Sequence, residues 1–93
     1  MRVIGYIEHP RLKISVFDTE HRYPVKFEDG TREQIYRFRK SEALSGLTDV
    51  QQLVDEEFIA AVERTFRKMG LDQRAVLDRL GGGGAETGLP EII

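Results

Sequence analysis

Apolar and polar residues alternate along most of the first forty positions of the chain, and this pattern predicts β-strands. The segments 2–8 (RVIGYIE), 12–17 (LKISVF) and 23–27 (YPVKF) each place apolar residues or glycine at every second position. Because successive side chains of a strand point to opposite faces, each segment has one apolar face. A fourth segment follows Asp29-Gly30, a pair that is typical of tight hairpin turns. The pattern therefore predicts four consecutive antiparallel strands.

The expected turns set the register of these strands. A two-residue turn at Asp29-Gly30 places Phe27 opposite Arg32. A symmetric reversal at the first proline, which cannot donate a backbone hydrogen bond, places Ile7 opposite Leu12. Both registers gather the apolar residues onto one core face, which consists of Val3, Ile7, Leu12, Ile14, Val16, Tyr23, Val25, Phe27, Tyr36 and Phe38.

A period of 3.6 residues replaces the alternation between Thr48 and Met69 and predicts one long amphipathic helix. Thr48 begins a capping box (T-x-x-Q), and Gly70 follows the last apolar residue, where glycine commonly ends a helix. Asp72 is then the expected N-cap of a short second helix within residues 71–80. The core-facing side of the long helix carries Val54, Phe58, Ala61, Val62 and Phe66.

These elements predict an α+β fold, a four-stranded antiparallel β-meander with one long helix packed on one face and a short C-terminal helix. Residues 1–80 are expected to form a single domain, since a chain of 93 residues builds one modest core. The four glycines at 81–84 are costly to order, so residues 81–93 are expected to form a flexible glycine-rich C-terminal tail.

Composition narrows the classes of protein to which the chain can belong. It has no cysteine, which excludes disulfides, thiol nucleophiles and thiolate metal sites. It has neither an apolar leader nor a run of about 20 apolar residues, so we expect a cytoplasmic protein without membrane association. Residues 1–40 hold nine Lys/Arg against six Asp/Glu, and residues 41–93 hold five against ten. The front of the chain is therefore basic and the back acidic, a polarity that can attract an anionic partner or hold the two halves together.

The sequence predicts no catalytic, cofactor-binding or metal-binding residue. His9 and His21 lie in predicted turns, and neither has a second ligand at helical spacing. No serine stands in a nucleophile motif, and the glycine run lacks the Lys-Ser/Thr of a phosphate-binding loop. Asp55 lies at the margin of the apolar helix stripe and is interpreted as a rim carboxylate that reaches water or pairs with an Arg or Lys of the sheet, rather than as a catalytic acid. We therefore expect a protein that is not an enzyme.

The face of the sheet opposite the core is the candidate interaction surface. It combines aromatic, apolar and cationic side chains, namely Tyr6, Lys13, Phe17, Lys26, Ile35, Arg37 and Arg39. The first hypothesis is a non-enzymatic protein-interaction or self-associating module that binds a protein partner or a second copy through this outer face or through an edge strand. It predicts that Tyr6, Phe17 and Ile35 form one contiguous exposed apolar patch.

The alternative hypothesis is binding of single-stranded nucleic acid or another polyanion. Tyr6 and Phe17 would stack on bases, and the four cations of the surface would contact phosphates. The overall pI of about 5.7 is unlike the basic footprint of most such proteins. Neutralisation of the surface by Glu8, Glu28 and Glu33 would weigh against this hypothesis.

Overall fold

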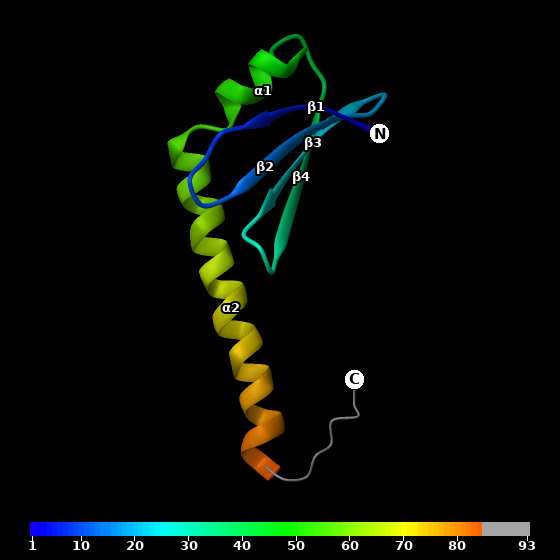
Figure 1. Ribbon diagram of the computed structural model, residues 1–93. Coiled ribbons are helices and arrows are strands. Elements are labelled where there is room, and N and C mark those ends of the chain that lie inside the picture. Colours follow the sequence, from blue (N-terminus) through cyan, green and yellow to red (C-terminus); the bar gives the residue numbers. More distant parts are fainter. Residues whose placement is uncertain (85–93) are drawn as a thin grey trace. The chain divides into compact units, whose positions relative to one another are not determined.

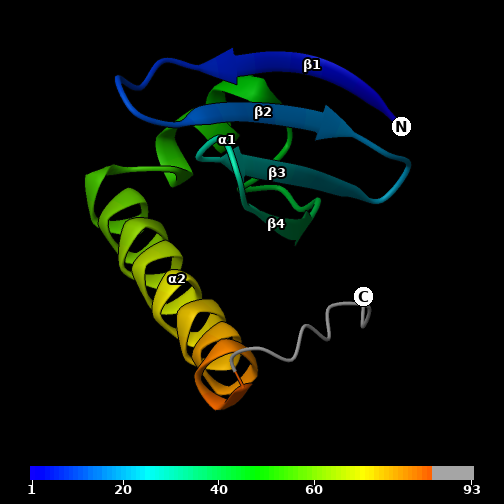
Figure 2. The same cartoon turned by 60° about the horizontal axis from the view of Figure 1, so that its bottom comes forward.

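The computed structural model describes residues 1–84, which contain one antiparallel sheet and two helices (Figure 1). The strands are β1 (Arg2–Ile7), β2 (Lys13–Asp18), β3 (Arg22–Glu28) and β4 (Glu33–Arg39), and the helices are α1 (Leu47–Leu53) and α2 (Glu56–Gly84). Each strand pairs with the next, in the order β1-β2-β3-β4 that Figure 2 shows. The predicted α+β class and the four-stranded meander are therefore confirmed. The chain divides into two compact units, Met1–Glu63 and Arg64–Ile93, and the predicted single domain over residues 1–80 stays a prediction.

The turn between β3 and β4 is longer than the predicted two-residue turn. Phe27 lies opposite Gln34 and not opposite Arg32. The Asp29 side chain organises the loop, because its Oδ1 accepts hydrogen bonds from two loop N–H groups, including that of Arg32 at 2.8 Å. Gly30 has a φ of +104°, which glycine adopts readily. The register differs from the prediction by two residues, an even number, so every side chain stays on its predicted face.

The turn between β1 and β2 shows the same kind of correction. Ile7 lies opposite Ile14 and not opposite Leu12. The His9 ring closes the turn: its Nδ1 accepts hydrogen bonds from the backbone N–H groups of Arg11 at 3.1 Å and of Leu12 at 3.2 Å. This imidazole therefore has a structural role in the turn, and the two-residue change of register again preserves the faces.

A β-bulge in β1 overturns the prediction that Val3 belongs to the core. Val3 lies opposite Phe17, whereas Gly5 lies opposite Val16, so Ile4 is an extra residue in the ladder. One extra residue reverses the alternation of side chains along the strand. Val3 is therefore on the outer face beside Phe17, with 42% of its surface exposed.

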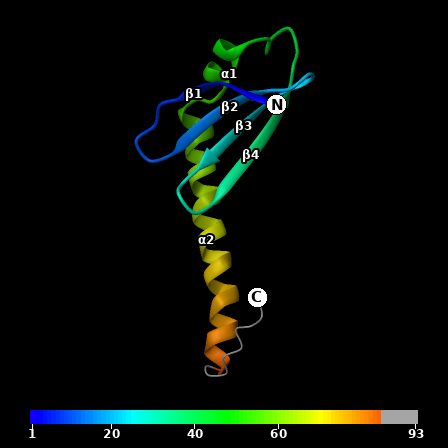
Figure 3. The same ribbon diagram turned by 45° about the vertical axis from the view of Figure 1, so that its right-hand side comes forward.

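The core of the first unit lies between the inner face of the sheet and the helices. The Phe58 ring, in the first turns of α2, makes edge-to-face contacts with Phe27, Tyr36 and Phe38 at centroid distances of 5.5, 5.1 and 6.0 Å. Figure 3 shows these first turns behind the sheet. The largest fully buried side chains are Ile14, Val16, Val25, Phe27, Val50 and Val62. The start of α2 therefore packs on the inner face, as the amphipathic pattern predicts.

The predicted helix from Thr48 to Met69 is interrupted. α1 begins after Gly46, with no side-chain cap, and ends at Leu53. Asp55 Oδ1 then accepts a hydrogen bond from the backbone N–H of Phe58 at 2.8 Å, which is the geometry of an N-cap. The expected capping box at Thr48 is therefore wrong, and Asp55 is the residue that begins the long helix.

α2 also continues beyond its predicted end at Gly70. An interior glycine costs only about 1 kcal/mol relative to alanine, and strong helix formers follow it. Lys68 and Asp72, four residues apart, form an ion pair of 2.8 Å across this position. The short helix of the fold is therefore α1, before the long helix, and not a C-terminal element. α2 reaches Gly84, and the rest of the predicted tail lies outside the described residues.

Candidate functional site

The outer face of the sheet, defined as the face opposite Phe58, carries all seven residues of the predicted interaction surface. The ladder aligns Tyr6, Ser15, Lys26 and Ile35 in one row across the four strands. Phe17 and Arg37 lie on the side of this row toward Val3, and Lys13 lies on the other side. The β registers therefore bring together residues that are up to 33 positions apart in the sequence.

The single contiguous apolar patch that the first hypothesis requires is not formed. Tyr6 is 57% exposed and Ile35 44% exposed, but they stand on opposite edge strands. Lys26 lies between them, with its Nζ 5.8 Å from the centroid of the Phe17 ring and 3.5 Å from a carboxylate oxygen of Glu28. A cationic side chain therefore divides the outer face into two apolar areas.

One of these areas is an apolar corner, which consists of Val3, Tyr6 and Phe17 on β1 and β2. Val3 and Tyr6 are exposed, and Phe17 is half-buried. Sequence reasoning missed Val3 because it assumed unbroken alternation along the strand. Gly5 is the signal that could have revealed the change, because a glycine inside a strand often marks a bulge.

The cations of the outer face fall into two groups. Lys13 lies opposite Glu28, which in turn lies opposite Glu33, and Lys26 forms its ion pair with Glu28. Carboxylates therefore accompany the two lysines. At the other end of β3 and β4, a basic corner holds Arg22, Arg37 and Arg39, with Arg22 directly opposite Arg39. All three are exposed, and none forms an ion pair with any residue that the structure describes.

The free edge of the sheet at β4 is the second candidate feature. Two backbone hydrogen bonds bracket the β3–β4 ladder, from Asp29 N–H to the Arg32 carbonyl at 3.2 Å and from Lys40 N–H to the His21 carbonyl at 2.9 Å. Hydrogen-bonded pairs recur at every second residue of an antiparallel ladder, so the even-numbered residues of β4 bond to β3. The odd-numbered residues direct their N–H and C=O groups away from the sheet, and these are Glu33, Ile35, Arg37 and Arg39.

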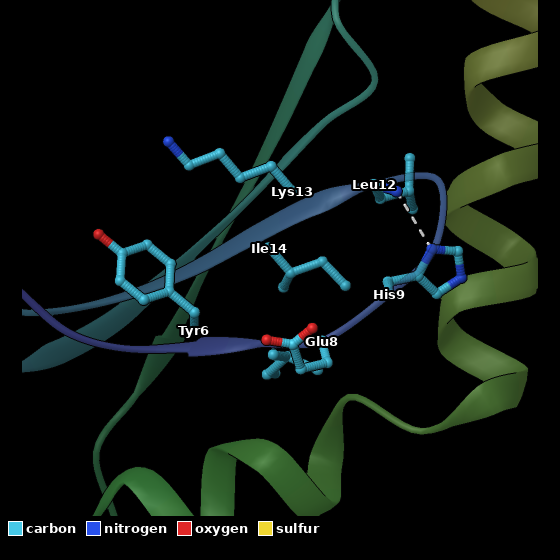
Figure 4. Close-up of a pocket in the computed structure, with 7 residues that line it drawn as sticks. Tyr6, Glu8, His9, Leu12, Lys13 and Ile14 are labelled. Carbon is cyan, nitrogen blue, oxygen red and sulfur yellow. Dashed lines mark hydrogen bonds between the residues drawn. The ribbon is translucent and has the colours of Figure 1, made fainter.

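A depression of about 330 Å³ opens beside the β1–β2 turn (Figure 4). Tyr6, Glu8, His9 and Lys13 line it, and Figure 4 shows the His9 ring turned toward the backbone of the turn. No nucleophile and no oriented acid-base pair converge there. Within residues 1–84, no three or more His, Asp or Glu side chains gather in a way that could hold a metal ion.

A second depression, of about 340 Å³, lies between the same turn and the first turns of α2. Two of its polar side chains link these two segments, because Arg11 Nη2 lies 2.8 Å from Glu63 Oε2 in an ion pair. The pKa of Asp18 is lowered chiefly by its hydrogen bond with Lys40, an ion pair of 2.7 Å at the opposite end of the sheet. The ion pairs Arg11–Glu63 and Lys40–Asp18 therefore connect separate segments of the fold.

No known protein family, curated protein or solved structure matches the chain. Among the helices of residues 1–84, none is both long and apolar enough to traverse a lipid bilayer.

Proposed function

We propose that the chain is a non-enzymatic self-association module in which β4 pairs antiparallel with β4 of a second copy. The observation that carries this proposal is the free edge of β4, whose outward backbone groups have no partner among the described residues. An open edge strand is a ready template for another strand, and pairing with an identical strand covers two edges at once.

The side chains of β4 are complementary to themselves in one register. When Ile35 lies opposite Ile35 of the second copy, Glu33 lies opposite Arg37 of that copy and the reverse pair forms across the two-fold axis. This register uses only odd-numbered residues, whose backbone groups point outward. It covers the exposed Ile35 side chain and compensates two charges on each strand. The pairing would join two four-stranded sheets into one of eight strands.

The division of the outer face by Lys26 favours the edge over the face as the contact. A partner that docked flat on the sheet would have to displace the Lys26 ion pair with Glu28 to reach both apolar areas. An edge contact leaves Lys26 in place and uses hydrogen bonds that β4 cannot make within its own sheet.

Cross-linking through an introduced cysteine tests this register, because the chain has no cysteine of its own. In a dimer of the Ile35→Cys variant, the two introduced cysteines face each other with their Cα atoms about 5.5 Å apart, within the range of a disulfide. The matched control is Arg39→Cys on the same strand and face. Its two cysteines would be roughly 27 Å apart, at about 3.4 Å per residue from the axis.

Under mild oxidation we expect a covalent dimer from Ile35→Cys and monomer from Arg39→Cys on non-reducing gels. Light scattering on the native protein should show a dimer fraction that grows with concentration. Equal cross-linking of the two variants, or a monomer mass at all concentrations, would overturn the proposal.

The basic corner favours a second candidate function, the binding of a single-stranded nucleic acid or another polyanion. Three exposed guanidinium groups on adjacent strands suit phosphate oxygens, and they lie away from the carboxylates that accompany the lysines. Titration with a short single-stranded RNA at two salt concentrations tests this function. An affinity that falls steeply with salt concentration, and falls less steeply for the double variant Arg37→Gln/Arg39→Gln, would support it. A titration without binding at low salt would eliminate it.

A further inference from the structure

The second half of α2 carries an exposed apolar stripe. Residues 71–81 are all exposed, including Val76 at 53%, Leu77 at 57% and Leu80 at 45%. At about 100° per residue, these three side chains and Gln73 lie within roughly 100° of one another on the helix surface. Leu71, exposed at 67%, lies on the opposite side. The α2 stripe is defined as Gln73, Val76, Leu77 and Leu80.

The spacing of the α2 stripe is that of a helix-pairing seam. Met69, Gln73, Val76 and Leu80 follow one another at intervals of four, three and four residues, which is the alternation of core positions in paired helices. An amphipathic helix generally buries such a stripe against another element. Within the described part of the second unit, the apolar side chains of Val76, Leu77 and Leu80 stay exposed.

The charges beside the α2 stripe indicate the occupant. Asp72, which also pairs with Lys68 of its own helix, and Arg79 lie on the same flank, seven residues and two helical turns apart. In an antiparallel pair of identical helices, Asp72 therefore approaches Arg79 of the second copy, and Arg79 approaches Asp72 of the second copy. The same alignment sets Val76 beside Gln73 and Leu80 beside Met69 of the other helix. In a parallel pair, the same flank of the two helices lies on opposite sides of the contact, so Asp72 and Arg79 do not meet.

We propose that the α2 stripe binds the α2 stripe of a second copy in an antiparallel helix pair. This contact is separate from the β4 edge and does not rest on the proposed function. If both contacts form, each chain offers two different two-fold surfaces, and assemblies grow beyond a dimer. The chain then acts as a bivalent building block.

The test separates the two surfaces by using full-length protein that carries Ile35→Arg, which places two arginines opposite each other at the β4 axis. In this background, Leu77→Gln removes an apolar group from the α2 stripe, and Leu71→Gln makes the same change on the opposite side of the helix. Leucine and glutamine have similar helix propensities, so both variants keep the helix. Circular dichroism checks that they do.

Sedimentation equilibrium up to about 1 mM protein should show a dimer for the background and for Leu71→Gln. For Leu77→Gln we expect association at least about 10-fold weaker. Equal association of the Leu77→Gln and Leu71→Gln variants, or a monomer mass for the background, would overturn the proposal and leave the β4 contact untouched.

Charge exchange tests the antiparallel alignment in the same background. Asp72→Arg and Arg79→Asp each turn two attractive contacts into repulsive ones, so each variant alone should associate about 10-fold more weakly. An equimolar mixture of the two restores both attractive contacts and should form heterodimers. A mixture that associates no better than its components would refute the antiparallel alignment.

Discussion

A buried polar link between the sheet and α2 gives a sharp test of the fold. The Gln34 side chain is only 8% exposed; its Nε2 donates a hydrogen bond to the Val62 carbonyl at 2.9 Å, and its Oε1 accepts one from the Tyr36 hydroxyl. No buried side-chain nitrogen or oxygen among the described residues lacks a hydrogen-bond partner. The Gln34 amide therefore bonds to two groups at once. The effects of substituting Gln34 and Tyr36 on the free energy of unfolding should accordingly be strongly coupled.

The magnitudes follow from which groups lose their partners. Tyr36→Phe leaves the buried Gln34 oxygen without a donor, which costs about 1.5 kcal/mol of unfolding free energy. Gln34→Met is nearly isosteric and removes both hydrogen bonds of the amide. Because the half-buried Tyr36 hydroxyl can still reach water, the expected loss of unfolding free energy is about 1 kcal/mol. The double variant removes both polar groups together and should also cost only about 1 kcal/mol. The coupling free energy is then about 1.5 kcal/mol.

Urea denaturation of the wild type, the two single variants and the double variant, followed by circular dichroism, measures this coupling. Tyr23→Phe combined with Gln34→Met is the matched control. Tyr23 is also buried in the sheet, but within residues 1–84 its hydroxyl makes no hydrogen bond, so these two effects should add. A coupling below about 0.5 kcal/mol between Gln34 and Tyr36 would refute the reasoning.

Two further predictions concern the bulge and the β3–β4 turn. A Cβ at Gly5 would lie 2.7 Å from Leu47 Cδ2, so Gly5→Ala should cost about 1 kcal/mol in urea denaturation, and Leu47→Ala in the same chain should relieve that clash. The pKa of Asp29 is lowered, chiefly by the hydrogen bond from the backbone N–H of Thr31. The stability that this carboxylate contributes is therefore complete above about pH 4 and is lost as the pH falls through the lowered pKa. The free-energy difference between wild type and Asp29→Asn should accordingly shrink on acidification, whereas a pH-independent difference would contradict this assignment.

The candidate surface was largely predictable because a register error of an even number of residues leaves every side chain on its predicted face. Both hairpins differ from the predicted pairing by two residues, and Tyr6, Lys26 and Ile35 still lie on the outer face. The separation of Tyr6 and Ile35 by Lys26 was not predictable. It depends on the position of the Lys26 side chain, which lies over the Phe17 ring and pairs with Glu28. Side-chain packing determines this position, and the alternation of residues along a strand does not.

By itself, the sequence determined the strand segments, their two faces and the amphipathic helix, because these follow from local periodicities of two and 3.6 residues. The tertiary structure alone decided three further features. The bulge at Ile4 adds one residue to the β1 side of the ladder with β2, and this places Val3 on the outer face. The helix breaks before Asp55, whose cap lets Phe58 meet three rings of the sheet. α2 continues through Gly70, because the cost of one glycine is small beside the hydrogen bonds of a helix that continues on both sides.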